Sequence, residues 1–271
     1  MAIPGGPASV LEVAAAPGRE GRTPVLLLHG FAGDVLTWQF TVTPLAGDRP
    51  VIAVDLPGHG QSTPDVGDGR VAGFAPWLEQ VLDALDVPRV HVVGHSMGGA
   101  VALALARTAP GRVAALSLIA PAGLSPDFDR ELLRRLPCLR TPAEADACAA
   151  RLFAGPSPLA AGVARVLLAN AVRPERRAAL ERIIDASFRT DPEPLERTAA
   201  VAPVQVLWGR CDGVIPLPPA DRLPPGARLH VFEDAGHMLH GECPGPVGAA
   251  VRAFLAGAEG RAGEEEPWSR R

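Results

Sequence analysis

One segment near the middle of the chain constrains the fold more than any other. An apolar run at residues 90–93 stops at Gly94, and Ser96 and two further glycines follow before an alanine-rich stretch at 100–106. This order predicts a buried strand, a tight turn and a helix, with Ser96 at the apex of the turn. The residues around Ser96 fit the G-x-S-x-G nucleophile elbow, in which side chains at the glycine positions would collide with the neighbouring strand and helix.

Short apolar runs alternate with helical patterns along most of the chain. This alternation predicts a mostly parallel sheet covered by helices on both faces. We expect helices at 35–44, 74–85 and 97–108. The expected strands are an edge strand at 9–14 and buried strands at 24–28, 51–54, 90–93, 114–119, 204–208 and 228–232.

The strand pattern is interrupted between residues 124 and 202. We expect a helical cap there, inserted after the sixth strand of a core formed by residues 1–123 and 203–257. A separate helical domain is the alternative. The tail at 258–271 is expected to be disordered. The expected cap helices lie at 127–136, 142–153, 158–171 and 174–188.

The composition of the 271-residue chain is that of an ordinary globular protein, with 47% hydrophobic and 21% charged residues and a formal net charge of −4. No basic patch indicates nucleic acid, and no apolar run reaches membrane-spanning length or forms a signal peptide. The four cysteines form no C-x-x-C pair and are expected to be free thiols. We therefore expect a cytoplasmic protein without a membrane partner, metal or cofactor, and the sequence leaves its oligomeric state open.

A serine hydroxyl needs a neighbouring base to act as a nucleophile, and the base needs an orienting acid. Asp212 follows the strand at 204–208, and His237 follows the strand at 228–232. The carboxyl ends of parallel strands meet at one edge of a sheet, so both side chains should approach Ser96. We expect Ser96 to be the nucleophile, His237 the base and Asp212 the acid. Glu233 and Asp234 are too close to His237 along the chain to reach around it easily.

An oxyanion hole is the next requirement of such a site. The backbone N–H of Met97 is one expected donor, and that of Phe31, in the glycine-flanked loop at 29–33, is the other. The segment at 55–62 contains His59 and has the pattern of a structural turn. We expect His240 to lie in the pocket wall or at the surface.

The substrate pocket is expected to involve four residues near these motifs. His95 is expected to pack against or hydrogen-bond the elbow. The alanine, leucine and valine content of the cap indicates an apolar acyl or alcohol site. The four pocket candidates are His95, Leu124, Val214 and Met238.

These segments resemble the α/β-hydrolase superfamily over residues 25–255. The resemblance implies an α/β-hydrolase fold with a Ser-His-Asp triad. A nearer likeness, at 118–124 and 235–238, is to the hydrolase-like domain of the dihydrolipoyl acetyltransferase component of bacterial acetoin dehydrogenase; the H-x-x-x-D-G acyltransfer motif is not found. The matching segments are His29-Gly30-Phe31, Asp55-Leu56-Pro57-Gly58-His59-Gly60, Gly94-His95-Ser96-Met97-Gly98-Gly99, Asp212 and Gly236-His237.

The meta-cleavage C–C hydrolases resemble the chain in the position of the cap and in the sequence Ser-Met-Gly-Gly. They typically carry Trp after the catalytic His, where this chain has Met238, and they favour Asn before the nucleophile, where it has His95. The first hypothesis is therefore a cofactor-independent serine hydrolase acting on small-molecule esters or thioesters. C–C bond hydrolysis, and a non-catalytic partner of an acyl-transfer complex, are the alternatives.

Overall fold

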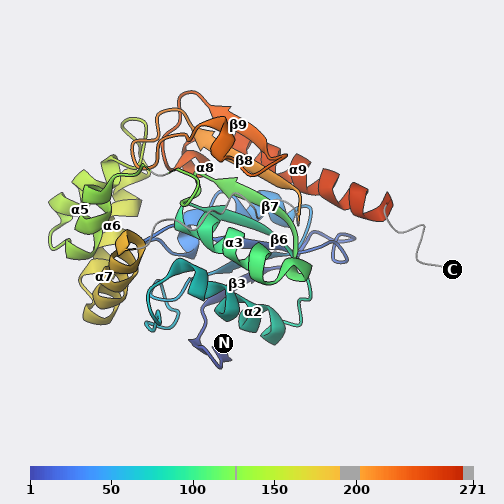
Figure 1. The fold of residues 1–271 in the computed structure, drawn as a ribbon, viewed down its shortest axis with the longest axis horizontal. Helices are drawn as coiled ribbons and strands as arrows, with labels where there is room; N and C mark the ends of the chain where they lie inside the picture. The colour runs from blue at the N-terminus through green and yellow to red at the C-terminus, as the bar shows by residue number, and fades with distance from the viewer. Residues whose placement is uncertain (126, 190–201, 265–271) are drawn as a thin grey trace.

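The computed structural model describes residues 1–125, 127–189 and 202–264 (Figure 1). A seven-stranded sheet lies at the centre, with the strand order β3-β5-β4-β6-β7-β8-β9. Edge strand β3 is antiparallel to β5, and every other neighbouring pair is parallel. The strands are β3 (Val10–Val13), β4 (Val25–Leu28), β5 (Val51–Val54), β6 (Val90–His95), β7 (Val113–Ile119), β8 (Val204–Gly209) and β9 (Arg228–Phe232), preceded by the hairpin β1 (Ala2–Ile3) and β2 (Gly6–Pro7).

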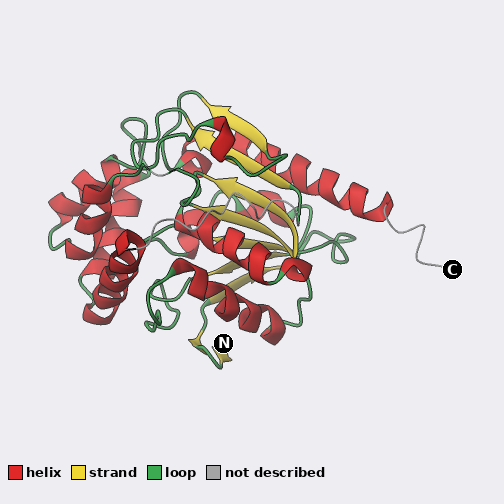
Figure 2. Ribbon diagram, in the orientation of Figure 1, coloured by secondary structure: helices red, strands yellow, loops and turns green. Residues whose placement is uncertain are grey.

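Helices cover both faces of the sheet, as Figure 2 shows. Helices α2 (Phe74–Ala84) and α3 (Met97–Thr108) pack against each other, and α1 (Val42–Ala46) packs against α9 (Pro244–Glu264). All residues of β4, β5 and β6 are buried, as expected for parallel strands covered on both sides. The short elements are η2 (Val71–Gly73), η3 (Pro110–Arg112), η6 (Ala220–Arg222) and α8 (Leu239–Glu242).

The helix expected at 35–44 is instead two pieces, a 3₁₀ turn η1 (Val35–Trp38) and the short helix α1. The side chain of Asp34 caps η1 by accepting a hydrogen bond from the Leu36 N–H at 2.9 Å. Pro44 lacks an N–H, so it is tolerated in the first turn of a helix but not in its interior. A helix that includes Pro44 therefore begins at Val42 and does not continue from η1.

The cap helices lie together beyond one end of the sheet (Figure 1). They follow β7, which is the fifth strand along the chain within the seven-stranded sheet, and not a sixth strand as expected. They begin or end a few residues inside their expected ranges; Asp129, for example, caps the first cap helix by accepting from the Leu132 N–H at 2.9 Å. The elements are α4 (Arg130–Arg135), η4 (Leu136–Cys138), α5 (Pro142–Ala150), α6 (Ala160–Ala171) and α7 (Pro174–Arg189).

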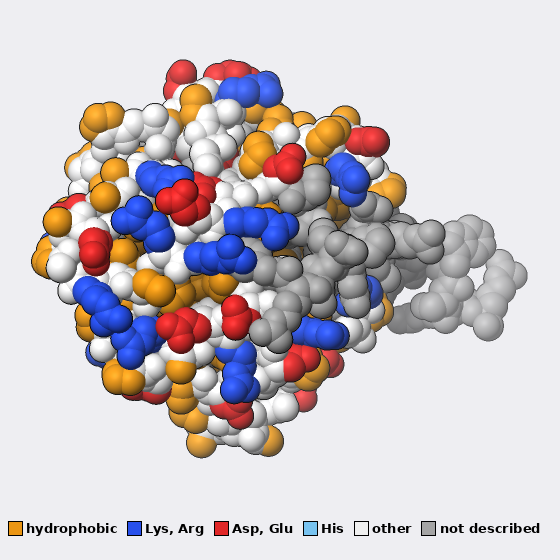
Figure 3. Space-filling view, turned by 60° about the vertical axis from the view of Figure 1, so that its left-hand side comes forward, with side chains coloured by type: hydrophobic (Ala, Val, Ile, Leu, Met, Phe, Trp, Pro, Cys, Tyr) orange, Lys and Arg blue, Asp and Glu red, His pale blue; other side chains and the backbone are white. Residues whose placement is uncertain are grey.

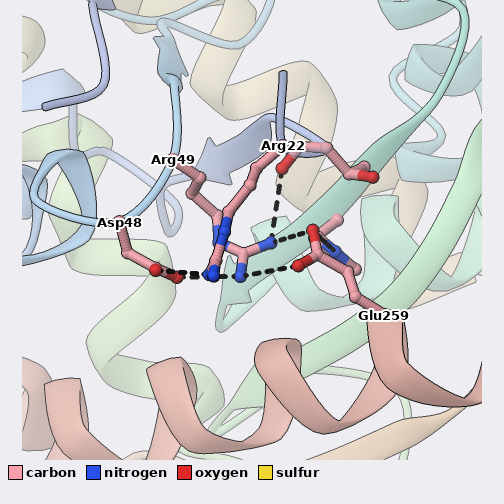
Figure 4. Close-up of polar contacts among 6 residues, drawn as sticks. Arg22, Asp48, Arg49 and Glu259 are labelled. Carbon is pink, nitrogen blue, oxygen red and sulfur yellow. Dashed lines mark hydrogen bonds and ion pairs between the residues drawn. The ribbon is translucent and has the colours of Figure 1, made fainter. Parts of the chain in front are cut away.

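The C-terminal helix is tied to the core by a buried arginine (Figure 4). Arg49 is fully buried, and its guanidinium donates to Glu259 of α9 at 2.8 Å and to Asp48 at 2.9 Å. Because α9 continues to Glu264, residues 258–264 are helical, and the expectation of a disordered tail is wrong for them. Residues 265–271 of that expected tail lie outside the described residues.

No helix in the described ranges is both long enough and apolar enough to cross a membrane. All four cysteines are described, and each is a free thiol. Cys138 and Cys211 are exposed, Cys148 is buried and Cys243 is half-buried.

Candidate active site

Ser96 occupies a sharp turn between central strand β6 and helix α3. Its backbone has φ of 52° and ψ of −118°, a strained conformation for a residue with a side chain. Its N–H donates to the Ile119 carbonyl at 2.9 Å, and its carbonyl accepts from the Ala122 N–H at 2.9 Å. The residues at the end of β7 therefore hold the strained turn from both sides.

The glycines around Ser96 leave no room for side chains. A Cβ atom added to Gly98 would lie 2.2 Å from the Leu28 carbonyl oxygen, and one added to Gly94 would lie 2.5 Å from the Gly98 carbonyl oxygen. Backbone atoms cannot move aside as the end of a flexible side chain can. The close crossing of strand and helix that positions Ser96 thus requires glycine at both places.

Asp212 and His237 meet at the carboxyl edge of the sheet. Asp212 follows β8 and His237 follows β9, and the His237 Nδ1–H donates to Asp212 Oδ2 at 2.8 Å. The other carboxylate oxygen, Oδ1, accepts backbone N–H groups from Val214 at 2.8 Å and Ile215 at 2.9 Å. Both side chains are buried. The carboxylate is therefore fixed by its own loop and can orient the imidazole.

The two other acids near His237 lie elsewhere. Glu233 is exposed and forms an ion pair with the exposed Arg210 at 3.1 Å. Asp234 is also exposed. The structure therefore places Asp212, and neither alternative, against the His237 ring.

The loop after β4 places Phe31 beside Ser96. His29 fixes this loop, because its Nε2 accepts the Leu56 N–H at 2.9 Å and its Nδ1–H donates to the Gly30 carbonyl at 2.8 Å. Burial lowers the pKa of His29, which keeps the ring in this neutral form. A Cβ atom on Gly30 would lie 3.2 Å from the Ser96 Cβ, so the loop approaches the elbow closely.

His59 supports the same loop from behind. Its ring packs edge-on to Phe31 with 5.9 Å between centroids, and its Nδ1 is 2.9 Å from the Pro57 carbonyl oxygen. Burial lowers the pKa of His59 to about 3. Asp55 accepts backbone N–H groups from Val35 and Gln61. The segment at 55–62 thus braces the Phe31 loop, in keeping with the structural turn predicted for it.

A buried aromatic cluster lies against His237. His95 Nε2 is 3.0 Å from the His237 carbonyl oxygen, so His95 is a hydrogen-bonding neighbour of the site. The His240 ring lies between His95, at 4.5 Å, and Trp38, at 5.0 Å, measured between centroids. His240 is 1% exposed and does not line the pocket, so the prediction of a pocket-wall or surface position is wrong. Short helix α8 turns this side chain inward, which no local pattern revealed.

A cavity of about 760 Å³ lies between the sheet edge and the cap. Ser96, His237 and Phe31 line it on the core side. Of the predicted pocket residues, His95, Val214 and Met238 line it, whereas Leu124 does not. Leu124 is buried in the core in the segment that follows β7. The cap contributes Leu133, Leu136, Leu152, Phe153, Leu159 and Leu167, among others.

Sequence reasoning missed the polar residues that the cap adds. Asn170 of α6 donates to the Ala32 carbonyl at 2.9 Å and so joins the cap to the Phe31 loop. Arg165 and Arg173 also line the cavity. The only sequence signal for Arg165 and Arg173 as lining residues was their spacing around the turn between α6 and α7. In the described part of the chain, no group of three or more His, Cys, Asp or Glu side chains is arranged to hold a metal ion.

The fold and the serine elbow define a class of protein, and comparison with known families agrees with it. Residues 23–153 match the family described as alpha/beta hydrolase fold. The chain belongs to the α/β-hydrolase superfamily, as its motifs predicted.

Its relatives include the dihydrolipoyllysine-residue acetyltransferase component of the acetoin cleaving system of Pseudomonas putida, 36% identical over 244 residues. That match covers 88% of this chain and 65% of the relative, so the chain spans less than two thirds of the relative's length. The predicted nearer likeness is thereby confirmed.

Two solved structures illustrate the range of similar folds. A membrane phospholipase A, described as a bacterial virulence factor, is 28% identical with a TM-score of 0.82, over 96% of this chain and 85% of that one. A meta-cleavage product hydrolase from Pseudomonas fluorescens IP01 is 23% identical with a TM-score of 0.77, over 95% of this chain and 97% of that one. The second likeness shows the fold alone.

Proposed function

We propose that the chain is a cofactor-independent serine hydrolase that cleaves small-molecule carboxylic esters or thioesters through an acyl-enzyme on Ser96. One observation carries the proposal. The His237 ring, held by Asp212 at 2.8 Å, lines the same cavity as the strained Ser96. Acyl transfer needs a nucleophile, a base that takes its proton and an acid that orients the base.

In the first half of the reaction, Ser96 Oγ attacks the substrate carbonyl carbon while His237 Nε2 takes the hydroxyl proton. The imidazolium that forms is stabilised by the Asp212 carboxylate. Collapse of the tetrahedral intermediate breaks the bond to the alcohol or thiol, which leaves with the proton from His237. In the second half, a water molecule attacks the acyl-enzyme, His237 takes its proton, and the carboxylic acid leaves with Ser96 restored.

The charge on the tetrahedral oxygen needs preorganised donors, each worth about 3 kcal/mol in comparable sites. We assign this role to the backbone N–H groups of Met97, at the start of α3, and Phe31. The braced loop that carries Phe31 and the helix that begins at Met97 support this assignment, because both donors are then fixed before the substrate binds.

Ester or thioester cleavage is favoured over the alternatives. Met238 and His95 stand where C–C hydrolases typically carry Trp and Asn, and the similar phospholipase acts on an ester. A non-catalytic partner would not need a strained serine beside a positioned histidine. We assign the described residues between 124 and 189 as a cap that sets substrate preference; residues 190–201 of the expected cap lie outside the described residues. The exposed thiols of Cys138 and Cys211 favour a reducing, cytoplasmic location.

A fluorophosphonate probe tests the proposal directly. The wild-type protein should be labelled, and Ser96→Ala should not. In parallel, 4-nitrophenyl acetate, butyrate and octanoate and a meta-cleavage dienoate should be offered as substrates. Turnover of the dienoate alone would reassign the reaction to C–C cleavage, and the absence of both labelling and turnover would reject an enzyme.

A further inference from the structure

Two arginines line the cavity at its cap end. Arg165 lies on α6, and Arg173 lies in the turn to α7. Neither guanidinium forms an ion pair or hydrogen bond with any residue that the structure describes. Among the described residues, Asp34 is the only carboxylate that lines the cavity, and it caps η1 through the Leu36 N–H. Two solvent-exposed positive charges without a described partner thus lie at this end of a largely apolar cavity.

A third arginine lies buried next to them. Arg176 is only 7% exposed, and its Nε and Nη1 have no hydrogen-bond acceptor among the described residues. Glu175 and, more weakly, Asp55 attract this guanidinium electrostatically, but both Asp55 oxygens already accept backbone N–H groups, from Val35 and Gln61. An unpaired buried charge costs several kcal/mol, so folded proteins rarely keep one without a use.

The geometry of α7 turns Arg176 toward the cavity's edge. Residues three apart share one helix face, so Arg176 and Ala179 lie on the same side of α7, while Arg173 lies in the turn just before the helix. Ala179 packs on Gly58, since a Cβ atom added to Gly58 would lie 3.1 Å from the Ala179 Cβ. Arg176 therefore faces the loop at 57–61, and that loop's Gly60 and Gln61 line the cavity beside Arg173.

The geometry points to an anion subsite at the cap end of the cavity. Arg173 and Arg176 bind a carboxylate or phosphate group of the substrate, while its apolar part runs along the cavity toward Ser96. Arg165 adds a further positive charge at the same lining. This inference rests on the proposed function and narrows it: the substrate class is an anionic ester or thioester. Figure 3 shows arginines, in blue, among apolar side chains on the face that carries the cap.

The anion has two possible chemical sources, and matched substrates separate them. A carboxylate at the far end of the acyl chain is tested with the 4-nitrophenyl monoester of glutaric acid. A phosphate on the leaving group is tested with butyryl-phosphopantetheine. The neutral references are 4-nitrophenyl butyrate and butyryl-pantetheine. We expect kcat/KM for one of the charged substrates to exceed that of its neutral partner by about tenfold or more, the gain that charge-assisted hydrogen bonds supply.

Variants then assign the preference to the arginines. Arg173→Gln and Arg176→Gln should each lower the ratio of charged to neutral kcat/KM about tenfold. Arg177→Gln is the matched control and should leave the ratio unchanged: like Arg176 it does not line the cavity, but one residue further along α7 it projects about 100° around the helix from Arg176. An unchanged ratio in both test variants would overturn the subsite. So would a wild-type preference for neither charged substrate.

A binding measurement keeps the inference separate from the proposed reaction. Glutarate and inorganic phosphate, each at millimolar concentration, should raise the melting temperature of the Ser96→Ala protein. The same rise should be lost when Arg176→Gln is added. If the wild-type enzyme cleaves no ester but this rise is seen and lost, the anion subsite stands and the proposed function falls. If esters are cleaved without charge preference and the anions do not raise the melting temperature, the proposed function stands and the anion subsite falls.

Discussion

The side chain of His95, the residue before the elbow serine, holds the backbone of His237: its Nε2 lies 3.0 Å from the His237 carbonyl oxygen. Burial keeps the pKa of His95 well below 6.5, so the ring is neutral at neutral pH and Nε2 must carry the proton it donates. Two adjacent residues of the elbow thus make different contributions, because Ser96 occupies the strained turn at the cavity and the His95 side chain fixes the loop that carries His237.

Replacing His95 with Phe should lower kcat about fivefold and change KM little, because the hydrogen bond it removes, worth about 1 kcal/mol, positions His237 and does not touch the substrate. Steady-state kinetics on 4-nitrophenyl butyrate measure the split. His95→Gln, which keeps a donor, should recover part of the loss. A rise in KM at constant kcat would show instead that His95 acts as a pocket wall.

Ser96→Ala should remove ester turnover and leave the fold intact. Loss of the nucleophile typically leaves only the catalysis that binding and the oxyanion hole provide. We expect less than about one thousandth of the wild-type kcat, with an unchanged melting temperature or a small rise as the strained side chain shortens. Residual turnover above that level in a protein free of wild-type enzyme would show that another residue is the nucleophile.

Asp212→Asn should lower kcat by about 10⁴, because an amide at this position stabilises the wrong tautomer of His237. Glu233→Gln is the matched control, since this exposed acid lies on the adjacent loop and pairs with Arg210 at the surface. Its kcat should stay within about twofold of wild type. A severe loss for Glu233→Gln and a mild one for Asp212→Asn would mean that the acid is misplaced.

Shortening the apolar cap residues should change chain-length preference more than the chemistry. Leu136, Phe153 and Leu167 all line the cavity, whereas Leu180 of α7 is equally apolar and buried but does not. Each Ala variant should lose about 2–5 kcal/mol of stability. Only the lining variants should alter the relative kcat/KM for acetate, butyrate and octanoate esters. Equal losses on all three esters would leave the cap with a folding role alone. The side chain of Phe188, at the end of the cap helix expected at 174–188, lies outside the described residues.

The buried histidines should make the protein less stable as the pH falls. Burial lowers the pKa of His240 to about 3 from an unfolded value near 6.5, so below pH 6.5 the unfolded chain takes up a proton that the folded one does not. The contribution of His240 to the free energy of unfolding is therefore fully present above pH 6.5, and about 2 kcal/mol of it is lost by pH 5. Urea unfolding measures the free energy of unfolding at pH 7 and at pH 5. The drop between the two pH values should be smaller by that amount in His240→Phe than in the wild type.

The control for this experiment is His230→Phe, because the His230 ring is exposed on β9. It should keep the wild-type pH dependence. His29, His59, His91 and His95 also have pKa values lowered by burial, so the remaining pH dependence of His240→Phe should keep the same sign. An identical pH dependence in wild type and His240→Phe would show that His240 is not buried in solution.

The elements that the sequence predicts well are those with a strong local pattern. The expected strands coincide with the seven strands of the sheet to within about two residues at most ends, and α3 begins and ends at the expected residues, because an apolar run or an alanine-rich stretch needs no distant partner to be recognised. The residues Ser96, Asp212 and His237 were predicted in the same way, since each lies shortly after the end of an expected strand.

What the sequence could not give depends on contacts across the fold. His240 resembles any polar residue of a short helix until Trp38 and His95 enclose it. Leu124 lies at the right place along the chain for a pocket but is buried in the core and does not line the cavity. Arg176 lacks a described partner only because α7 packs on a loop more than a hundred residues earlier. Burial and pairing of this kind are properties of the packed molecule, which a local pattern does not encode.

The buried arginine under α9 sets a practical limit for anyone who shortens or fuses this protein. Arg49 shares its charge between Asp48, its neighbour in sequence, and Glu259, more than two hundred residues away. A chain that stops before Glu259 would leave part of a fully buried charge uncompensated beneath the sheet. Tags and fusion partners therefore belong beyond this residue, although Ser96, Asp212 and His237 all precede it by more than twenty positions.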